Sequence, residues 1–176
     1  RSSRPGPSDQ GIAMTALLAL DFDGVICDAL LECAAIIWYS VPGRDPGGQV
    51  PMRALVDRVP QSFLELFTVV RNHSRTLEDF TAAVSPHAGS IQDQAGFAAV
   101  LAGMSPAARS SLAARAARIR SYWRASDRSA WLDLHRVHPP VAEAIRSRDD
   151  GVAVVTAKDE ASVREILAHH GLDKHV

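Results

Sequence analysis

The chain has 176 residues, 47% of them hydrophobic, and its 19 basic and 20 acidic side chains leave a formal net charge of −1. Such a chain can bury a globular core, and its balanced charge provides no field that would favour nucleic acid or an anionic membrane. No apolar run reaches transmembrane length, and residues 15–20 are too short and too soon followed by acids for a signal peptide. We expect a cytoplasmic protein with neither nucleic acid nor a membrane as partner; the sequence indicates no oligomeric state.

Residues 1–13 are rich in proline, glycine and serine, a composition that predicts a flexible tail outside the fold. Met14 is the start that we expect for the folded part.

The run from Ala16 to Leu20 is continuously apolar, which is typical of a strand covered on both faces in a parallel sheet. Asp21 and Asp23 follow at its carboxyl end, where open α/β sheets bind ligands, and Gly24 lets the backbone turn closely around a ligand. Two carboxylates there suit Mg²⁺, and one of them can also act as a nucleophile. The alternative is a pair of loop acids that cap the next helix.

Residues 26–138 have helical periodicity. Three apolar stripes predict successive helices: Ile26, Leu30, Cys33 and Ile37; Phe63, Leu66, Phe67 and Val70; and Leu77, Phe80 and Val84 with Thr76 as the N-cap. Ser105 followed by Pro106 predicts the start of the longest helix, which should run through Trp123 towards Leu134. Residues 41–49 and 85–90 should be loops.

Several polar side chains in this interval have competing interpretations. The cluster Arg71, Asn72, His73 and Arg75 is interpreted as a solvated helix end, the alternative being a site for a substrate carboxylate or second phosphate. His135 and His138 are interpreted as surface or capping residues, because no third zinc ligand is recognisable. Cys27 and Cys33 should be reduced, buried residues of a helix.

The run from Gly151 to Val155 predicts a second buried strand, which ends at Thr156, Ala157 and Lys158. Residues 159–170 then have helical periodicity, with Asp159 as the N-cap and Gly171 as the stop.

In these two strand ends the sequence resembles the haloacid dehalogenase (HAD) superfamily, in the phosphoglycolate phosphatase-like branch with a helical cap. DFDGV at residues 21–25 is similar to the first motif of that family and VVTAK at residues 154–158 to the second. The resemblance implies that Asp21 is the nucleophile and Asp23 the general acid/base. It implies that Thr156 binds the phosphoryl group with help from neighbouring backbone at Gly24, Ala157 and Lys158.

The same resemblance implies an α/β fold with a partial Rossmann-like parallel sheet from residues 14–25 and 139–176 and a helical cap from residues 26–138. The implied activity is hydrolysis of a small phosphorylated metabolite, with Mg²⁺ held by Asp21 and Asp23. Lys158 is expected either to contact the substrate or to offset the acidic pair.

The family's third-motif lysine or arginine and fourth-motif acidic pair have no counterpart here, because the chain ends at Val176 and its only lysines are Lys158 and Lys174. We therefore interpret the chain as an amino-terminal fragment or a truncated product. Its first strand should have one unpaired edge, and we expect no lysine to offset the two carboxylates, weak Mg²⁺ affinity and little activity.

Two other function classes stay open. A non-catalytic remnant with a binding or regulatory role would fit the missing motifs. A nucleotide-sugar transferase could use the acidic pair to hold Mn²⁺ and a diphosphate, although Thr156 at a second strand end argues against it. Release of phosphate from a phosphomonoester would distinguish the phosphatase from both.

Overall fold

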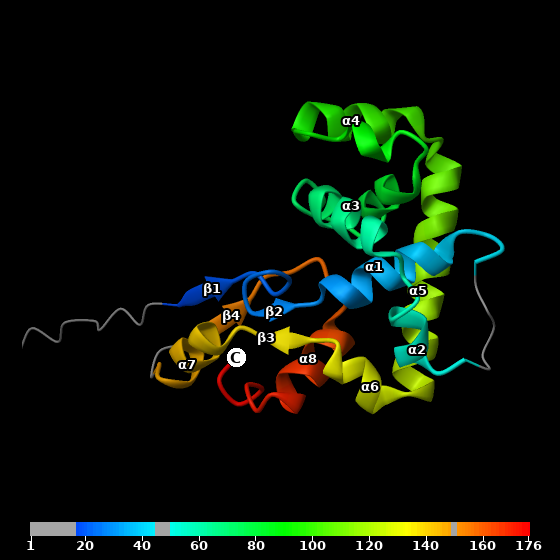
Figure 1. Cartoon of the computed structure of the whole chain (residues 1–176). Helices are drawn as coiled ribbons and strands as arrows, with labels where there is room; N and C mark the ends of the chain where they lie inside the picture. The colour runs from blue at the N-terminus through cyan, green and yellow to red at the C-terminus, as the bar shows by residue number, and fades with distance from the viewer. Residues whose placement is uncertain (1–16, 45–49, 149–150) are drawn as a thin grey trace, which may run out of the picture.

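The computed structural model describes residues 17–44, 50–148 and 151–176. The expected tail and Met14 lie outside the described residues. The elements in chain order are β1 (Leu18–Leu20), β2 (Cys27–Asp28), α1 (Leu30–Ser40), α2 (Met52–Val56), α3 (Gln61–Arg71), the 3₁₀ helices η1 (Asp79–Val84) and η2 (Ala88–Ser90), α4 (Gln94–Gly103), α5 (Pro106–Ser126), α6 (Arg128–Asp133), β3 (Arg136–Val137), α7 (Pro139–Arg146), β4 (Val152–Val154) and α8 (Glu160–His169) (Figure 1).

The two predicted strands form a parallel pair, which confirms an α/β architecture. In β1 and β4, Leu18 lies opposite Val152 and Leu20 opposite Val154. The prediction that the first strand is covered on both faces is wrong: Leu17, just before β1, is 68% exposed, and the middle residue of β1 is exposed as well. The physical reason is that, among the described residues, β1 has only β4 as a neighbour and no layer covers its second face.

A second ladder that the sequence did not indicate closes the ends of the long insertion. β2 and β3 are antiparallel, with Cys27 opposite Val137, and the amide of His138 donates to the carbonyl of Ile26 at 2.9 Å. The two ends of the insertion therefore lie side by side. The expectation that Cys27 lies on a helix is wrong, because this residue belongs to β2. Both cysteines are free and buried, as predicted.

Inside the insertion, helices form largely where the apolar stripes predict them, with three corrections. The first helix begins at Leu30, so Ile26 precedes it. The stripe at Leu77, Phe80 and Val84 lies around the 3₁₀ helix η1 rather than in an α-helix. The longest helix starts after Ser105 as predicted, but it ends at Ser126, because Asp127 leaves helical geometry with φ −145° and caps the separate helix α6.

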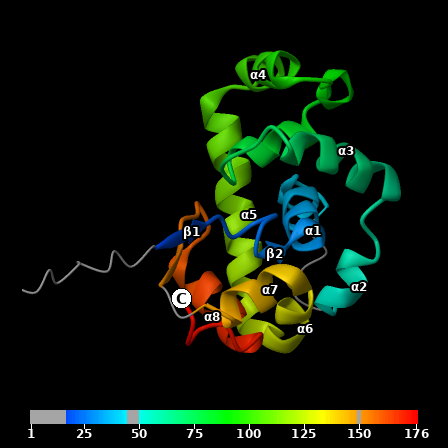
Figure 2. The same ribbon diagram turned by 90° about the vertical axis from the view of Figure 1, so that its left-hand side faces the viewer.

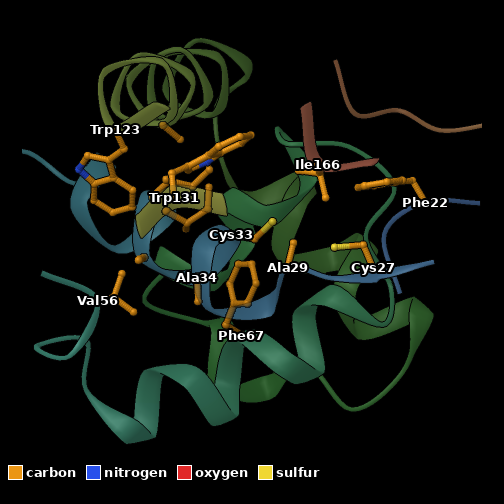
Figure 3. Close-up of a cluster of buried hydrophobic side chains, with 14 of the residues drawn as sticks. Phe22, Cys27, Ala29, Cys33, Ala34, Val56, Phe67, Trp123, Trp131 and Ile166 are labelled. Atoms are coloured by element: carbon orange, nitrogen blue, oxygen red, sulfur yellow. The ribbon is translucent and has the colours of Figure 1, made fainter. Parts of the chain in front are cut away.

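The hydrophobic core is continuous between the insertion and the strand region. In Figure 3, Cys33 and Ala34 of α1 lie between Phe67 of α3, Trp131 of α6 and Ile166 of α8. The buried side chains of the insertion and those of the strand region thus belong to one cluster. Trp123 of α5 and Trp131 of α6 are both core residues.

Helix α5 spans the molecule. Figures 1 and 2 both place α4 and α3 near one of its ends and α6 and α8 near the other. Ion pairs join this region to α8 and its cap: Arg124 of α5 lies 3.2 Å from Asp159, and Arg128 of α6 lies 2.9 Å from Glu165. In the described part of the chain, no helix combines the length and the apolar character needed to cross a membrane.

The start of α8 provides a test of the cap that fixes the end of the loop after β4. Asp159 accepts from the backbone amide of Ser162 at 2.9 Å. We expect Asp159→Ala to lower the free energy of unfolding by about 1 kcal/mol, the usual cost of losing an N-cap. Asp159→Asn keeps a capping oxygen and should cost less. Urea denaturation measures both, and an Asp159→Ala protein as stable as the parent would show that this cap does not contribute.

Candidate functional site

Five of the six site residues predicted from the two motifs come together. Asp21, Asp23, Thr156, Ala157 and Lys158 line one cavity of about 240 Å³ at the carboxyl ends of β1 and β4. The sixth, Gly24, does not line the cavity, and its amide donates to the carbonyl of Cys27 instead of facing a ligand. At about 30 Å³ per water molecule, this volume corresponds to roughly eight waters. The cavity therefore suits a small molecule.

A tight turn after β1 presents the two carboxylates. Phe22 is completely buried and anchors the turn, and its amide donates to Asp21 Oδ1 at 2.6 Å. Gly24 has φ +90°, a conformation that favours glycine, and its amide donates to the carbonyl of Cys27 at 2.7 Å. As a result Asp21 is exposed at the cavity and Asp23 is half-buried beside it.

Lys158 offsets the acidic pair. Its Nζ lies 3.5 Å from Asp23 Oδ1, and its side chain is only 1% exposed. Burial works against the ammonium form, but the nearby carboxylates of Glu32 and Asp23 outweigh it and raise the pKa of Lys158. The expectation that no lysine offsets the two carboxylates is therefore wrong, and the ion pair supports the second of the two roles expected for Lys158.

Thr156 is held within the loop that follows β4. Its Oγ1 accepts a hydrogen bond from the backbone amide of Lys158 at 3.1 Å. A hydroxyl that accepts in this way keeps its own hydrogen for donation. Thr156 can therefore donate to an oxyanion in the cavity.

A buried ion pair that sequence reasoning missed lies behind these residues. Glu32 is completely buried in the first turn of α1, and Arg120 of α5 donates to its two carboxylate oxygens at 2.7 and 3.0 Å. Arg120 also lines the cavity. Burial opposes ionisation of Glu32, but Arg120 outweighs it and holds the pKa of Glu32 well below its usual range. A lone acid in the apolar helix LLECAAIIWYS was the one signal available in the sequence.

The insertion supplies the remaining wall of the cavity. Its contributors are Arg71, Ser74, Arg75, Thr76, Leu77 and Phe80, together with Cys33 of α1. Arg71 Nη1 lies 3.2 Å from Asp28 Oδ1, whereas its Nη2 is buried with no hydrogen-bond partner among the described residues. The interpretation of this segment as a solvated helix end is therefore wrong for Arg71. Neither Asn72 nor His73 lines the cavity.

Asp21 and Asp23 have the chemistry to hold Mg²⁺. No group of three or more acidic, histidine or cysteine side chains able to hold a metal occurs in residues 17–44, 50–148 and 151–176. Mg²⁺, however, keeps several waters and is commonly bound by one or two carboxylates together with substrate phosphate oxygens. The two carboxylates at the end of β1 fit that requirement.

The histidines near the end of the insertion have structural roles. His135 is 1% exposed, and its Nδ1 lies 2.8 Å from the carbonyl of Trp131. The expectation of a surface or capping position is wrong for His135, because its ring packs against the ring of Trp131, with centroids 4.6 Å apart. Its carbonyl oxygen lies 2.7 Å from Nε2 of His170, the residue that follows α8. His138 directly precedes α7, at the N-cap position.

Comparison of the chain with models of known protein families found no match, and comparisons with curated proteins and with solved structures found none either. The features that point to a function are therefore the two motifs and the cavity that their residues line.

The buried pair predicts a coupled effect on stability. Arg120→Met leaves the Glu32 charge buried without its partner and should cost about 3–5 kcal/mol of unfolding free energy. The double variant Glu32→Leu with Arg120→Met removes both charges and should recover much of that loss. Urea denaturation of the parent, both single variants and the double variant gives the coupling energy; additive losses would contradict it.

The same pair predicts a dependence on pH. Because the pKa of Glu32 is lower in the folded than in the unfolded protein, its stabilisation is complete above the unfolded value of about 4.3 and is lost as the pH falls further. The parent should therefore lose more stability than the double variant as the pH is lowered below about 4.3. Parallel loss in the two proteins would argue against this contribution.

Proposed function

We propose that this chain belongs to a phosphatase of the HAD type, which hydrolyses a small phosphomonoester through an aspartyl-phosphate intermediate on Asp21. One observation carries the proposal: Asp21, Asp23 and Thr156, from strand ends far apart in the sequence, line a single cavity with Lys158 and Arg120. The proposal includes the finer fold assignment, in which β1 and β4 are part of a Rossmann-like sheet and residues 26–138 act as the helical cap.

The first step transfers the phosphoryl group to the enzyme. Asp21 Oδ1 accepts from the amide of Phe22, so Oδ2 is the oxygen that we expect to attack phosphorus. A phosphorus–oxygen bond forms to Asp21 as the ester bond breaks, and Asp23 gives a proton to the leaving alcohol oxygen.

The second step regenerates the enzyme. A water molecule attacks phosphorus, Asp23 takes the proton from that water, and the bond to Asp21 breaks with release of inorganic phosphate. Lys158 Nζ lies 3.5 Å from Asp23 Oδ1 and helps to hold that side chain in position during this step.

Positive charge and donors around the cavity stabilise the phosphoryl oxygens. Lys158 and Arg120 provide charge next to Asp23, and the hydroxyl of Thr156 provides a hydrogen bond. Mg²⁺ bound by Asp21 and Asp23 would supply further charge to the phosphoryl oxygens.

The cavity of about 240 Å³ has room for a phosphoryl group together with a short carbon skeleton. The insertion also covers the site with Leu77 and Phe80, two side chains that help to exclude water while the intermediate forms.

The test is phosphate release from small phosphomonoesters with added Mg²⁺. We expect Asp21→Asn to abolish turnover and Asp23→Asn nearly to do so, while Thr156→Ala should lower kcat by on the order of 10²-fold, as the loss of one oxyanion donor does. Mass spectrometry of rapidly quenched protein should detect phosphate on the peptide that contains Asp21.

Asp57→Asn is the matched control, because Asp57 is an exposed acid at the end of α2, outside the cavity. It should leave the rate unchanged. Undiminished turnover by Asp21→Asn would exclude the mechanism, and the absence of phosphate release by the unchanged chain would favour a binding or regulatory role.

A further inference from the structure

One buried titratable side chain takes no part in the chemistry proposed above. His135 lies in the short connection between α6 and β3, where the insertion returns to the strand region, and it is 1% exposed. We propose that its ring makes the contact between the insertion and α8 sensitive to acid: the neutral ring stabilises this contact, and protonation of the ring weakens it. The property does not depend on the proposed hydrolysis.

The hydrogen bond of the His135 ring fixes which nitrogen can gain a proton. Nδ1 lies 2.8 Å from the carbonyl oxygen of Trp131. A carbonyl oxygen only accepts, so Nδ1 carries the hydrogen of the neutral ring and Nε2 carries none. Protonation must therefore occur at Nε2.

A proton on Nε2 of His135 would have no acceptor nearby. This atom is buried, with no hydrogen-bond partner among the described residues. The ring of Trp131 packs against the imidazole, with centroids 4.6 Å apart, but an indole nitrogen only donates. A protonated ring would bury a charged N–H without an acceptor, which costs more than the unpaired lone pair of the neutral ring.

Charged groups from three elements act on the His135 ring. Burial is the largest influence, and it lowers the pKa of His135 below its usual value. Glu32 of α1 favours the protonated form, whereas Lys158 of the loop after β4 and Arg120 of α5 oppose it. Arg120 already donates to both carboxylate oxygens of Glu32, so this negative charge is largely compensated.

The backbone of His135 takes part in the contact with α8. Its carbonyl oxygen accepts from Nε2 of His170, the residue that follows α8, at 2.7 Å. Helices α6 and α8 lie near each other in Figures 1 and 2. A charged ring that moves toward solvent would displace this carbonyl group and with it the C-terminal end of α8. Because the loop at Thr156 leads into α8, the cavity would be disturbed as well.

A second histidine contact between α6 and α8 works in the opposite direction. His169 Nε2 lies 4.0 Å from Asp133 Oδ1, and protonation of His169 would strengthen this pair. The two side chains are 38% and 51% exposed, and ion pairs at such positions contribute little to stability. The stability lost by charging buried His135 should therefore outweigh the stability gained at this pair.

The experiment is urea denaturation between about pH 7.5 and 5.5, a range above the titration of ordinary carboxylates. The stabilisation by neutral His135 is complete above the unfolded-state pKa of about 6.5 and is lost as the pH falls below it, because the unfolded chain then binds the proton more readily. Since one proton is taken up on unfolding, the unfolding equilibrium constant of the parent should rise by up to about tenfold per pH unit.

Two variants remove the titrating ring in different ways. His135→Phe keeps a buried ring, and His135→Asn keeps an N–H group that can donate to the carbonyl of Trp131. Both should lose most of the rise in the unfolding constant. His87→Gln, at an exposed histidine at the start of η2, is the matched control and should keep it.

Hydrogen exchange measured by mass spectrometry tests where the molecule loosens. After correction for intrinsic exchange rates, the protection of α8 should fall more between the same two pH values than that of α4, which lies near the other end of α5 (Figure 1). Equal loss of protection in the two helices would overturn the proposal.

The same pH dependence in the parent and in both His135 variants would also overturn it. If neither variant folds, NMR of the parent decides the question. The folded protein should contain His135 as the neutral Nδ1–H tautomer at about pH 6.0, below the usual histidine pKa of about 6.5, and a protonated ring there would contradict the proposal.

Discussion

The bidentate ion pair between Glu32 and Arg120 holds the cavity together, because it joins α1, the first helix after the acidic turn, to α5, the long helix that crosses the molecule. One turn further along α5, Arg124 reaches Asp159 at the start of α8 and also donates to the hydroxyl of Ser162. Arg120 and Arg124, one turn apart on α5, therefore connect this helix to α1 and to the start of α8, which lie next to the acidic turn and the loop at Thr156. The pair also brings a negative charge behind Lys158, which allows a nearly inaccessible ammonium group to stay charged beside Asp23.

The sheet contributes to the cavity mainly through its register. Each strand has three residues, and the pairing of Leu20 with Val154 brings the residues that follow both strands to the same edge. The amide of Val155 donates to the carbonyl of Leu20 at 2.8 Å and closes this arrangement. Everything beyond that bond is determined by local turns and by side chains from the insertion. Buried Phe22 anchors the acidic turn against the core.

The parts of the structure that follow local rules could be predicted from the sequence: the two parallel strands, the cap of α8 by Asp159 and the Ser105–Pro106 start of α5. The missed features depend on contacts between distant residues. Glu32 and Arg120 are 88 positions apart, and neither segment contains a pattern that would predict their pairing. The end of α5 at Asp127 was missed because apolar periodicity continues across it into α6. The two-residue ladder of β2 and β3 is too short to have an alternating pattern.

The topology also has a consequence for the order in which the molecule folds. Leu18 and Val152 are 134 positions apart, so pairing β1 with β4 closes a very long loop for only three residues of ladder. Loop closure of that kind costs entropy before any contact compensates it, which makes such pairings slow. The β2–β3 ladder shortens the effective loop, because it brings Cys27 and Val137 together once the helices between them have packed. The acidic turn and the loop at Thr156 should consequently meet last, and a nascent or partly unfolded chain would contain an ordered helical body before the cavity between these two loops has formed.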